Sequence, residues 1–350
     1  MLYQRKNPHG GDIYQGDIRL DFSANTNPLG TPEGVLEAIA QALPQLHRYP
    51  DPYCRRLVQA ISDFEQVPKG EILCGNGAAE LIYGYCRAMA PKRAMELAPT
   101  FSEYSQALAQ VGCQVDRYGL RPGENFTLGA DFLTVLQEKQ PDVLFLCNPN
   151  NPTGQLIPRD RLAEILQLCR RIGCRVFLDE CFMDLCDRDE SMKGYLAEYP
   201  ELLILKAFTK SYGMAGIRLG YCLSGNGALL EAMSRQAQPW NVSLLAQAAG
   251  VAALGEQAFL QTTRELIFDQ RREMQRQLEA MGLWVCPSHA NYLLFRGRPG
   301  LDEQLRKQAI AIRNCGNYYG LEEGWYRVAV RRPEENRQLL DTMRTILERG

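Results

Sequence analysis

The chain has 350 residues, of which 45% are hydrophobic and 23% charged, a composition typical of a globular protein with a main domain and a smaller companion. Its formal net charge of −2 excludes a strongly basic protein, so we expect neither nucleic acid nor an anionic membrane among its partners. No segment reaches the roughly 18 consecutive apolar residues of a membrane-spanning helix, and the N-terminus lacks the apolar core of a signal peptide. We therefore expect a cytoplasmic protein.

The first two thirds of the chain alternate short apolar runs with amphipathic segments. Residues 159–171 form one such segment, in which Leu162, Ile165 and Leu166 recur at helical spacing. This alternation predicts an α/β fold in which a mostly parallel sheet is covered by helices on both faces. The strands are expected at 71–74, 143–147, 176–179, 202–207 and 219–223.

The pattern changes after residue 241. A long helical stretch, rich in Gln, Glu and Arg, is expected from about 244 to 281. Two strands at 291–295 and 326–330 and a final helix from about 334 follow it.

These changes predict two domains. Residues 45–240 are expected to form the large domain. Residues 1–44 and 241–350 are expected to form a small domain with an N-terminal arm. A ligand would then bind in the cleft between the domains, where closure can exclude water.

A glycine-rich turn follows the first expected strand of the sheet. Residues 75–80 read Gly-Asn-Gly-Ala-Ala-Glu and lead into a helical run at 81–88. Backbone amides at a helix N-terminus bind phosphate well, so Gly77 and Ala78 are candidate phosphate ligands. A dinucleotide-binding fingerprint would also begin this way, but its third glycine is replaced here by Glu80.

Two polar segments follow later strands. Residues 148–154 read Asn-Pro-Asn-Asn-Pro-Thr-Gly, and residues 179–182 read Asp-Glu-Cys-Phe. Open α/β sheets bind their ligands at this end of their strands. A pyridine ring that acts as an electron sink needs a carboxylate at its nitrogen, for which Asp179 is the candidate. Asn151 can hold the phenolic oxygen of such a ring.

The most informative segment is residues 209–220, Thr-Lys-Ser-Tyr-Gly-Met-Ala-Gly-Ile-Arg-Leu-Gly. It suits a lysine, Lys210, that forms a Schiff base with a phosphorylated aldehyde. Thr209 and the guanidinium fork of Arg218 would hold the phosphate. A solvated loop after a strand is the alternative interpretation of this segment alone.

The order of these four motifs resembles the pyridoxal-phosphate (PLP)-dependent aminotransferase superfamily of fold type I, over nearly the whole chain. It is most similar to the branch of histidinol-phosphate aminotransferase and threonine-phosphate decarboxylase. The resemblance implies a fold type I PLP-dependent transferase, with a large, mostly parallel α/β domain and a smaller α+β domain. It also implies PLP as cofactor, Lys210 and Asp179 as catalytic residues, and a homodimer with shared active sites.

Several segments tilt the resemblance toward the decarboxylase of cobalamin biosynthesis, among them residues 21–30, 238–242 and 312–321. Position 182 is Phe where the aminotransferases usually carry a tyrosine. The implied reaction is decarboxylation of L-threonine O-3-phosphate to (R)-1-amino-2-propanol O-2-phosphate for adenosylcobalamin biosynthesis. Histidinol-phosphate aminotransferase, or a related amino-acid aminotransferase, is the alternative.

The resemblance also implies roles for individual residues around the cofactor. Phe101 corresponds to the aromatic residue that stacks on the pyridine ring, and Tyr104 to a contact behind it; a core aromatic is the alternative for both. Tyr49 corresponds to the tyrosine that reaches the cofactor phosphate of the neighbouring subunit. Ala207 departs from the family, which often has a phosphate-binding serine there.

The remaining carried-over residues concern the substrate. Arg327 matches the arginine that binds the α-carboxylate, and Asn27 lies in the motif at residues 21–30. Arg313, Arg331 and His9 are candidates for the substrate phosphate, with a plain surface charge as the alternative for each.

No metal site is expected. The 12 cysteines are scattered without Cys-x-x-Cys spacing, and none of the 3 histidines has the spacing of a metal ligand. Most of the cysteines are expected to be buried free thiols.

Overall fold

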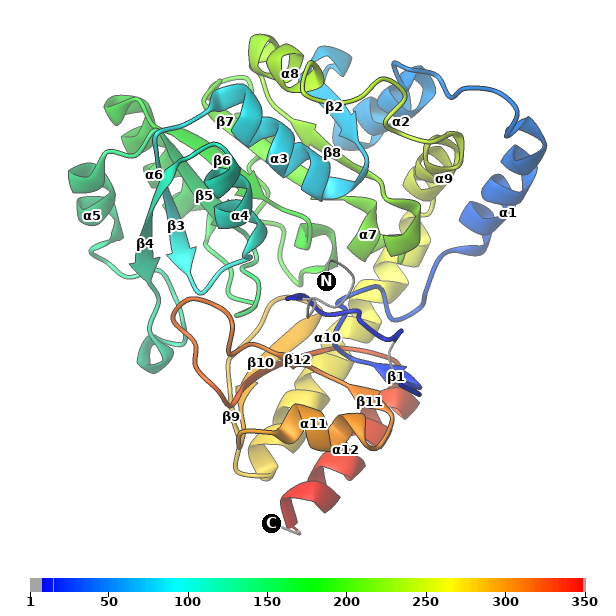
Figure 1. The fold of residues 1–350 in the computed structure, drawn as a ribbon, viewed down its shortest axis with the longest axis vertical. Coiled ribbons are helices and arrows are strands. Elements are labelled where there is room, and N and C mark those ends of the chain that lie inside the picture. Colours follow the sequence, from blue (N-terminus) through cyan, green and yellow to red (C-terminus); the bar gives the residue numbers. More distant parts are fainter. Residues whose placement is uncertain (1–7, 15, 349–350) are drawn as a thin grey trace.

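The computed structural model describes residues 8–14 and 16–348, which form a larger and a smaller unit (Figure 1). The larger unit is built on a seven-stranded sheet with the order β2-β8-β7-β6-β5-β3-β4. β8 runs antiparallel to both of its neighbours, and every other pairing in this sheet is parallel. The expected α/β fold with a mostly parallel sheet is therefore confirmed. The strands are β2 (Ile72–Gly75), β3 (Arg93–Ala98), β4 (Gln114–Gly119), β5 (Val143–Cys147), β6 (Arg175–Asp179), β7 (Leu202–Ala207) and β8 (Gly220–Leu223).

Helices cover both faces of this sheet. Strand β5 is buried along its whole length, because its alternate residues enter the cores on opposite faces. One face packs against α3 (Gly77–Met89), α4 (Glu103–Gln110) and α8 (Gly227–Ser234). The other packs against α2 (Arg55–Glu65), α5 (Phe132–Lys139), α6 (Arg159–Ile172) and α9 (Leu244–Gly255).

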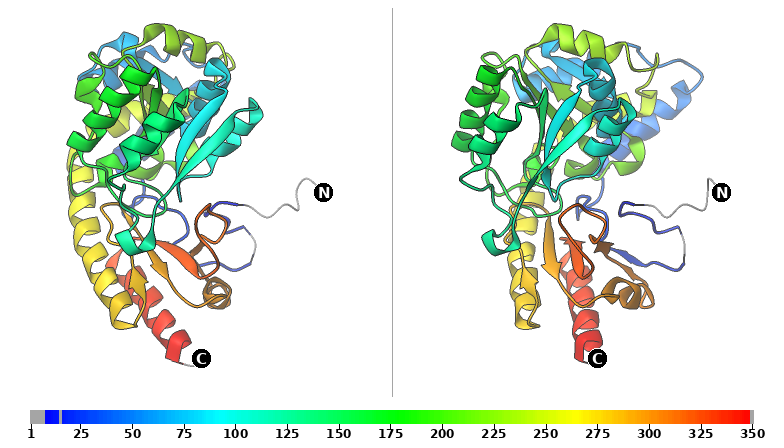
Figure 2. Two further views of the ribbon diagram at one scale, coloured as in Figure 1. Left: turned by 90° about the vertical axis from the view of Figure 1, so that its left-hand side faces the viewer. Right: turned by 60° about the vertical axis from the view of Figure 1, so that its left-hand side comes forward.

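The smaller unit holds a four-stranded antiparallel sheet with the order β12-β13-β10-β9. A separate parallel pair, β1 with β11, ties the N-terminal segment to this unit. The long helix α10 (Gln257–Ala280) extends along both units (Figure 2). The other elements are β1 (Leu20–Asp21), β9 (Trp284–Val285), β10 (Tyr292–Arg296), α11 (Leu301–Arg306), β11 (Ile310–Ala311), β12 (Arg313–Asn314), β13 (Trp325–Ala329) and α12 (Pro333–Glu348).

The helical stretch expected from about 244 to 281 is confirmed, and it consists of two helices, α9 and α10, rather than one continuous helix. Ser243 caps the first, α9, by accepting a hydrogen bond from the Ala246 amide at 3.1 Å. The chain leaves the helical conformation at Glu256, whose φ and ψ are −86° and 48°. Gly255 precedes the break and weakens the helix there. Because apolar periodicity continues on both sides, the pattern alone did not reveal the break.

Two helices lie apart from the unit to which the expected boundaries assigned them. Val35 of α1 (Glu33–Ala42) and Ala246 of α9 share one apolar core with Leu57 of α2, in the larger unit. The division at residues 45 and 240 stays a prediction, but α1 and α9 pack with the larger unit.

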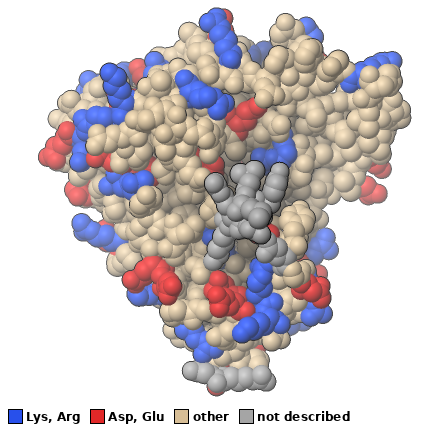
Figure 3. All heavy atoms as spheres, viewed as in Figure 1, with Lys and Arg blue, Asp and Glu red and all other residues tan. Residues whose placement is uncertain are grey.

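Lys, Arg, Asp and Glu side chains are intermingled over the face shown in Figure 3, in keeping with the small net charge. Among the described residues, no helix has the length and apolar content needed to cross a bilayer.

Candidate active site

A cavity of about 240 Å³ lies at the carboxyl ends of the central strands, where the larger unit faces the smaller one. Side chains from both units line it. Ten of the residues predicted from the sequence meet here: His9, Ala78, Phe101, Asn151, Asp179, Thr209, Lys210, Arg218, Arg313 and Arg327.

Lys210 lies on α7 (Phe208–Ser211), a single helical turn that begins directly after β7. Its Nζ is 5.6 Å from the centroid of the Phe182 ring. Removal from water and, to a smaller extent, the nearby charges of Arg327 and Arg218 lower the pKa of Lys210 from its ordinary value to about 8. A larger fraction of this amine is therefore neutral near pH 7 than for an ordinary lysine. A neutral amine is the form that attacks an aldehyde carbon.

Asp179 ends β6 and is 5% exposed, so its carboxylate must be stabilised by hydrogen bonds from the protein rather than from water. Its Oδ1 accepts a hydrogen bond from the Cys181 amide at 2.9 Å, and its Oδ2 accepts one from the Tyr104 hydroxyl at 2.6 Å. Burial raises the pKa of Asp179, while these hydrogen bonds and the charge of Lys210 oppose the rise. A protonated ring nitrogen would give this carboxylate the positive partner that a buried charge requires.

The N-terminus of α3 and Arg218 form a cradle for an anion. Gly77 has φ +77°, and a Cβ at this position would lie only 2.5 Å from Nη2 of Arg218. A Cβ at Gly220 would lie 2.7 Å from the amide nitrogen of Ala78. Both glycines thus allow the helix terminus and the arginine to approach each other. Thr209 lines the same part of the cavity, and Ala207 offers no hydroxyl there.

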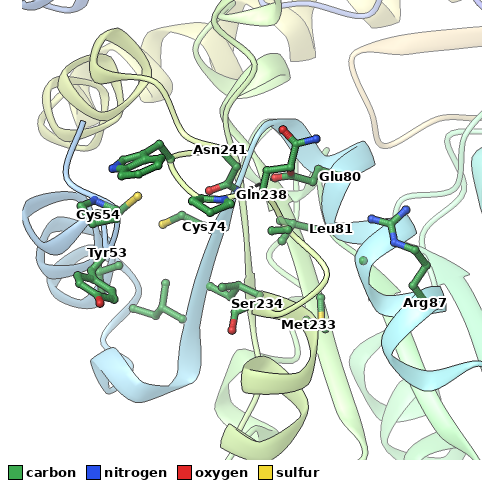
Figure 4. A pocket seen from close by; sticks show the side chains of 18 residues that line it. Tyr53, Cys54, Cys74, Glu80, Leu81, Arg87, Met233, Ser234, Gln238 and Asn241 are labelled. Atoms are coloured by element: carbon green, nitrogen blue, oxygen red, sulfur yellow. Dashed lines mark hydrogen bonds between the residues drawn. The ribbon is translucent and has the colours of Figure 1, made fainter. Parts of the chain in front are cut away.

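Glu80, in the first turn of α3, lines a second, larger groove of about 440 Å³ (Figure 4). Its Oε2 accepts hydrogen bonds from the Asn76 amide and from Asn241 Nδ2, both at 2.6 Å. The carboxylate therefore fixes the turn before α3 against the segment that leads to α9. Tyr53 and Trp240 line this groove and are 70% and 46% exposed.

Asn151 and Arg327 join the two units across the cavity. Arg327, on β13, donates to Asn151 Oδ1 and, at 2.9 Å, to the carbonyl oxygen of Ser23. Its Nε is buried without a hydrogen-bond partner in the described structure. Because the Asn151 oxygen is already occupied, its amide group is left to donate. An anion in the cavity would satisfy Arg327 better than the present contacts do.

Arg313 lies beside Arg327, since the two residues are register partners on β12 and β13. It donates to the carbonyl oxygen of Pro8 and, at 2.7 Å, to Asn317 Oδ1. His9 reaches the cavity from the N-terminal segment, and its Nε2 is 2.8 Å from Glu103 Oε1.

Four predicted residues are not among those that line this cavity: Gly77, which begins α3 beside Ala78, and Asn27, Arg331 and Tyr49, which lie elsewhere. Asn27 is 2% exposed and donates to the carbonyl oxygen of Ser211 at 2.7 Å. Arg331 donates to Glu335 on α12 at 3.2 Å. Tyr49 is 79% exposed and stacks on Trp240 with a centroid distance of 4.6 Å.

Several residues of the cavity were assigned no individual role from the sequence. Tyr318 contacts Asn151 Oδ1 through its hydroxyl at 3.4 Å, and its ring lies 5.2 Å from the Arg313 guanidinium. Tyr318 could have been proposed from the sequence, because it lies within residues 312–321, one of the segments that carry the resemblance. Other cavity residues without an expected role are Ser23, Asn25, Cys147 and Cys181.

These residues fit PLP. The cradle at α3 suits its phosphate, the Asp179 carboxylate its ring nitrogen, and Lys210 its aldehyde. Phe101 lies in the cavity wall, where an aromatic ring can stack. Within the described chain, no group of three or more His, Cys, Asp or Glu side chains is placed to hold a metal ion.

Comparisons with known proteins agree with this fit. The family model "Aminotransferase class I and II" matches residues 17–343. The chain is 39% identical to the threonine-phosphate decarboxylase of Salmonella typhimurium, over 97% of this chain and 96% of that protein. It is 31% identical to histidinol-phosphate aminotransferase 1 of Psychrobacter arcticus, over 94% and 87% of the respective chains. The crystal structure of the histidinol-phosphate aminotransferase from Clostridium acetobutylicum superposes with a TM-score of 0.88 at 28% identity, over 95% of this chain and 100% of that one.

Proposed function

Because the chain belongs to the aminotransferase class I and II family, a family of PLP-dependent enzymes, we propose that it decarboxylates L-threonine O-3-phosphate. The products are CO₂ and (R)-1-amino-2-propanol O-2-phosphate, and one proton is taken up at Cα in place of the carboxylate. The reaction would serve adenosylcobalamin biosynthesis.

The observation that carries this proposal is the pair of arginines on adjacent strands. Arg313 and Arg327 face one cavity from β12 and β13. Threonine phosphate carries two separate anionic groups, a carboxylate and a phosphate, and arginine forks suit both. We assign the carboxylate to Arg327 and the phosphate to Arg313, assisted by His9. A net charge of −2 does not attract an anionic substrate to the protein as a whole, so these local positive charges must bind it.

When bound, PLP supplies a protonated ring that accepts the electron pair left at Cα. The protein holds that ring in place through Asp179, Asn151, Phe101 and the phosphate cradle. Arg327 would hold the carboxylate and thereby orient the bonds at Cα. Lys210, whose pKa is about 8, can deliver a proton to Cα once CO₂ has left.

Aminotransferase activity is the second candidate. The same two arginines would also suit a dicarboxylate such as 2-oxoglutarate, the partner substrate of a transamination, and the 31% identical relative is a histidinol-phosphate aminotransferase. The choice depends on whether the carboxylate or the α-proton leaves Cα.

Mass spectrometry of products tests the proposal. PLP-loaded protein is incubated with L-threonine O-3-phosphate without any keto acid, and we expect CO₂ and aminopropanol phosphate. Conversion of histidinol phosphate with 2-oxoglutarate, and none of threonine phosphate alone, would establish the aminotransferase instead. Lys210→Ala is the control and should abolish either reaction.

We also propose that the protein acts as a homodimer with shared active sites. Tyr49 is exposed and lies outside its own chain's cavity, so its hydroxyl is available to the cofactor phosphate of a second copy. Trp240, against which it stacks, gives the same surface an apolar character. Tyr49→Phe should weaken PLP binding without dissociating the dimer in sedimentation. Tyr53→Phe, a change to another exposed tyrosine nearby, should leave PLP binding unchanged; equal affinities for both variants would contradict the assignment.

A further inference from the structure

We propose that Ser211 is the point through which a buried ion cluster positions Lys210, with Asp184, Lys206 and Asn27 as the positioning residues. The inference rests on the proposed role of Lys210 as the residue that binds the cofactor covalently. It gives a role to a group of charged side chains that do not line the cavity.

The cluster is centred on Lys206, which is 4% exposed and belongs to β7. Its Nζ is 2.6 Å from Asp184 Oδ1 and 3.3 Å from Glu65 Oε1. Asp184 lies on the short helix Met183–Leu185, and Glu65 on α2. One buried cation is thus held between two carboxylates from different parts of the larger unit.

The second carboxylate is fully paired. Glu65 accepts a hydrogen bond from the Tyr221 hydroxyl at 2.6 Å and from Lys193 Nζ at 2.9 Å. Burial alone would raise the pKa of Glu65, but the charge of Lys206 and these two partners lower it to about 2. Glu65 is therefore ionised at neutral pH and paired with Lys206, Tyr221 and Lys193, and these pairings restrict the geometry of the cluster.

The cluster lies on the face of the sheet away from the cavity. Ala207 lines the cavity, and its neighbour Lys206 points to the opposite face because successive side chains alternate along a strand. The charges of the cluster therefore have no direct contact with a ligand. The cluster can influence Lys210 through a contact with the chain that follows β7.

Ser211 provides that connection. Its Oγ donates to Asp184 Oδ2 at 2.9 Å, and its carbonyl oxygen accepts from Asn27 Nδ2 at 2.7 Å. Asn27 Nδ2 also donates to Thr263 Oγ1 at 3.0 Å, which fixes the asparagine to α10. The residue that follows Lys210 is therefore held through its side chain and through its backbone, from two directions.

Helix α7 needs such support, because it has only four residues, Phe208–Ser211. An isolated turn of this length does not form by itself, since helix nucleation is unfavourable. If the turn loosens, the amine of Lys210 samples more positions, and fewer of them have the geometry for attack on an aldehyde. The hydrogen bonds to Ser211 should thus accelerate formation of the bond between Lys210 and PLP.

Ser211→Ala tests this role, because it removes the link to Asp184 and leaves the ion cluster intact. Apoprotein is mixed rapidly with PLP, and the covalent bond is followed by absorbance and by borohydride trapping. We expect the rate constant to fall about tenfold, the size of effect that one lost hydrogen bond can have. Affinity for pyridoxamine 5′-phosphate, which cannot bond to the lysine, should stay unchanged.

Ser224→Ala is the matched control. Ser224 is also fully buried, and its hydroxyl donates to the Leu202 carbonyl oxygen at 2.8 Å, at the other end of β7. Both variants lose one buried hydrogen bond, so we expect similar shifts in melting temperature but slow bond formation only in Ser211→Ala. Asn27→Ala, which removes the other hydrogen bond to Ser211, should also slow it.

The outcomes separate this inference from the proposed function. If peptide mapping of the borohydride-reduced wild-type protein places PLP on a residue other than Lys210, the assignment of the lysine fails. If PLP is on Lys210 but Ser211→Ala and Asn27→Ala both react at the wild-type rate, the positioning role is overturned and the function stands. Equal slowing in Ser224→Ala would show a general loss of stability and would also overturn it.

Discussion

Gly77→Ala is the change that tests the phosphate cradle most directly. The new Cβ would lie 2.5 Å from Nη2 and 2.9 Å from Cζ of Arg218, well inside normal contact distance. The guanidinium must therefore move. Gly77 also has φ +77°, where an alanine costs about 1 to 2 kcal/mol.

The two effects act on different quantities. The backbone cost is present with and without cofactor, so it lowers the free energy of unfolding but leaves PLP affinity alone. The displaced arginine loses a hydrogen bond to a charged group, worth about 1.5 to 3 kcal/mol. We therefore expect the dissociation constant for PLP to rise roughly 10- to 100-fold.

The assay is an absorbance titration of apoprotein with PLP, together with thermal unfolding of the apoprotein. Gly216→Ala is the control, because Gly216 lies two residues before Arg218 and a Cβ there meets no atom within 4 Å. It should change the unfolding free energy by no more than about 0.5 kcal/mol. If Gly77→Ala binds PLP as tightly as Gly216→Ala does, the phosphate does not lie between α3 and Arg218.

Three further changes address the reacting groups. The pKa of Lys210 is about 8 in the folded protein and 10.5 ordinarily, so the buried charge of this lysine destabilises the apoprotein below pH 8. Lys210→Met should therefore raise the free energy of unfolding there by up to about 3 kcal/mol, and this gain should fade as pH rises toward 10.5. Chemical denaturation at several pH values measures it. Tyr104→Phe removes the 2.6 Å hydrogen bond to Asp179, and in steady-state kinetics it should lower kcat about tenfold while the KM for substrate changes little. An unaltered kcat would argue against Asp179 as the partner of the ring nitrogen. Arg327→Ala should raise the KM for a carboxylated substrate by about 100-fold, and an unchanged KM would refute its assignment to the carboxylate.

The local motifs could be recognised in the sequence because they combine particular side chains with particular backbone requirements. Lys210 and Asn151 each follow a buried strand and Asp179 ends one, and the order of strands in a parallel sheet brings such positions to one edge. The sequence placed these side chains in one site without any knowledge of distances. The cradle was readable for the same reason, since Gly77 follows a strand and begins a helix.

Features that depend on contacts between distant segments were less readable. Asn27 was expected at the substrate, yet it lies behind α7, where it holds Ser211 and Thr263. Nothing in the motif around Asn27 distinguishes a side chain that points into a cleft from one that points beneath it. In the sequence Lys206 likewise looks like an ordinary lysine in an apolar strand. Only the fold brings Glu65, 141 residues earlier in the chain, beside it.

The sequence by itself therefore determined the fold class, the family and the cofactor, and it predicted which residues surround that cofactor, because strand periodicity and residue type act locally. Only the tertiary structure decided where α9 ends, that Asn27 and Arg331 lie outside the cavity, and that Arg313 and Arg327 stand side by side in it. Those outcomes depend on which segments pack together, and packing energies are summed over partners that lie far apart along the chain.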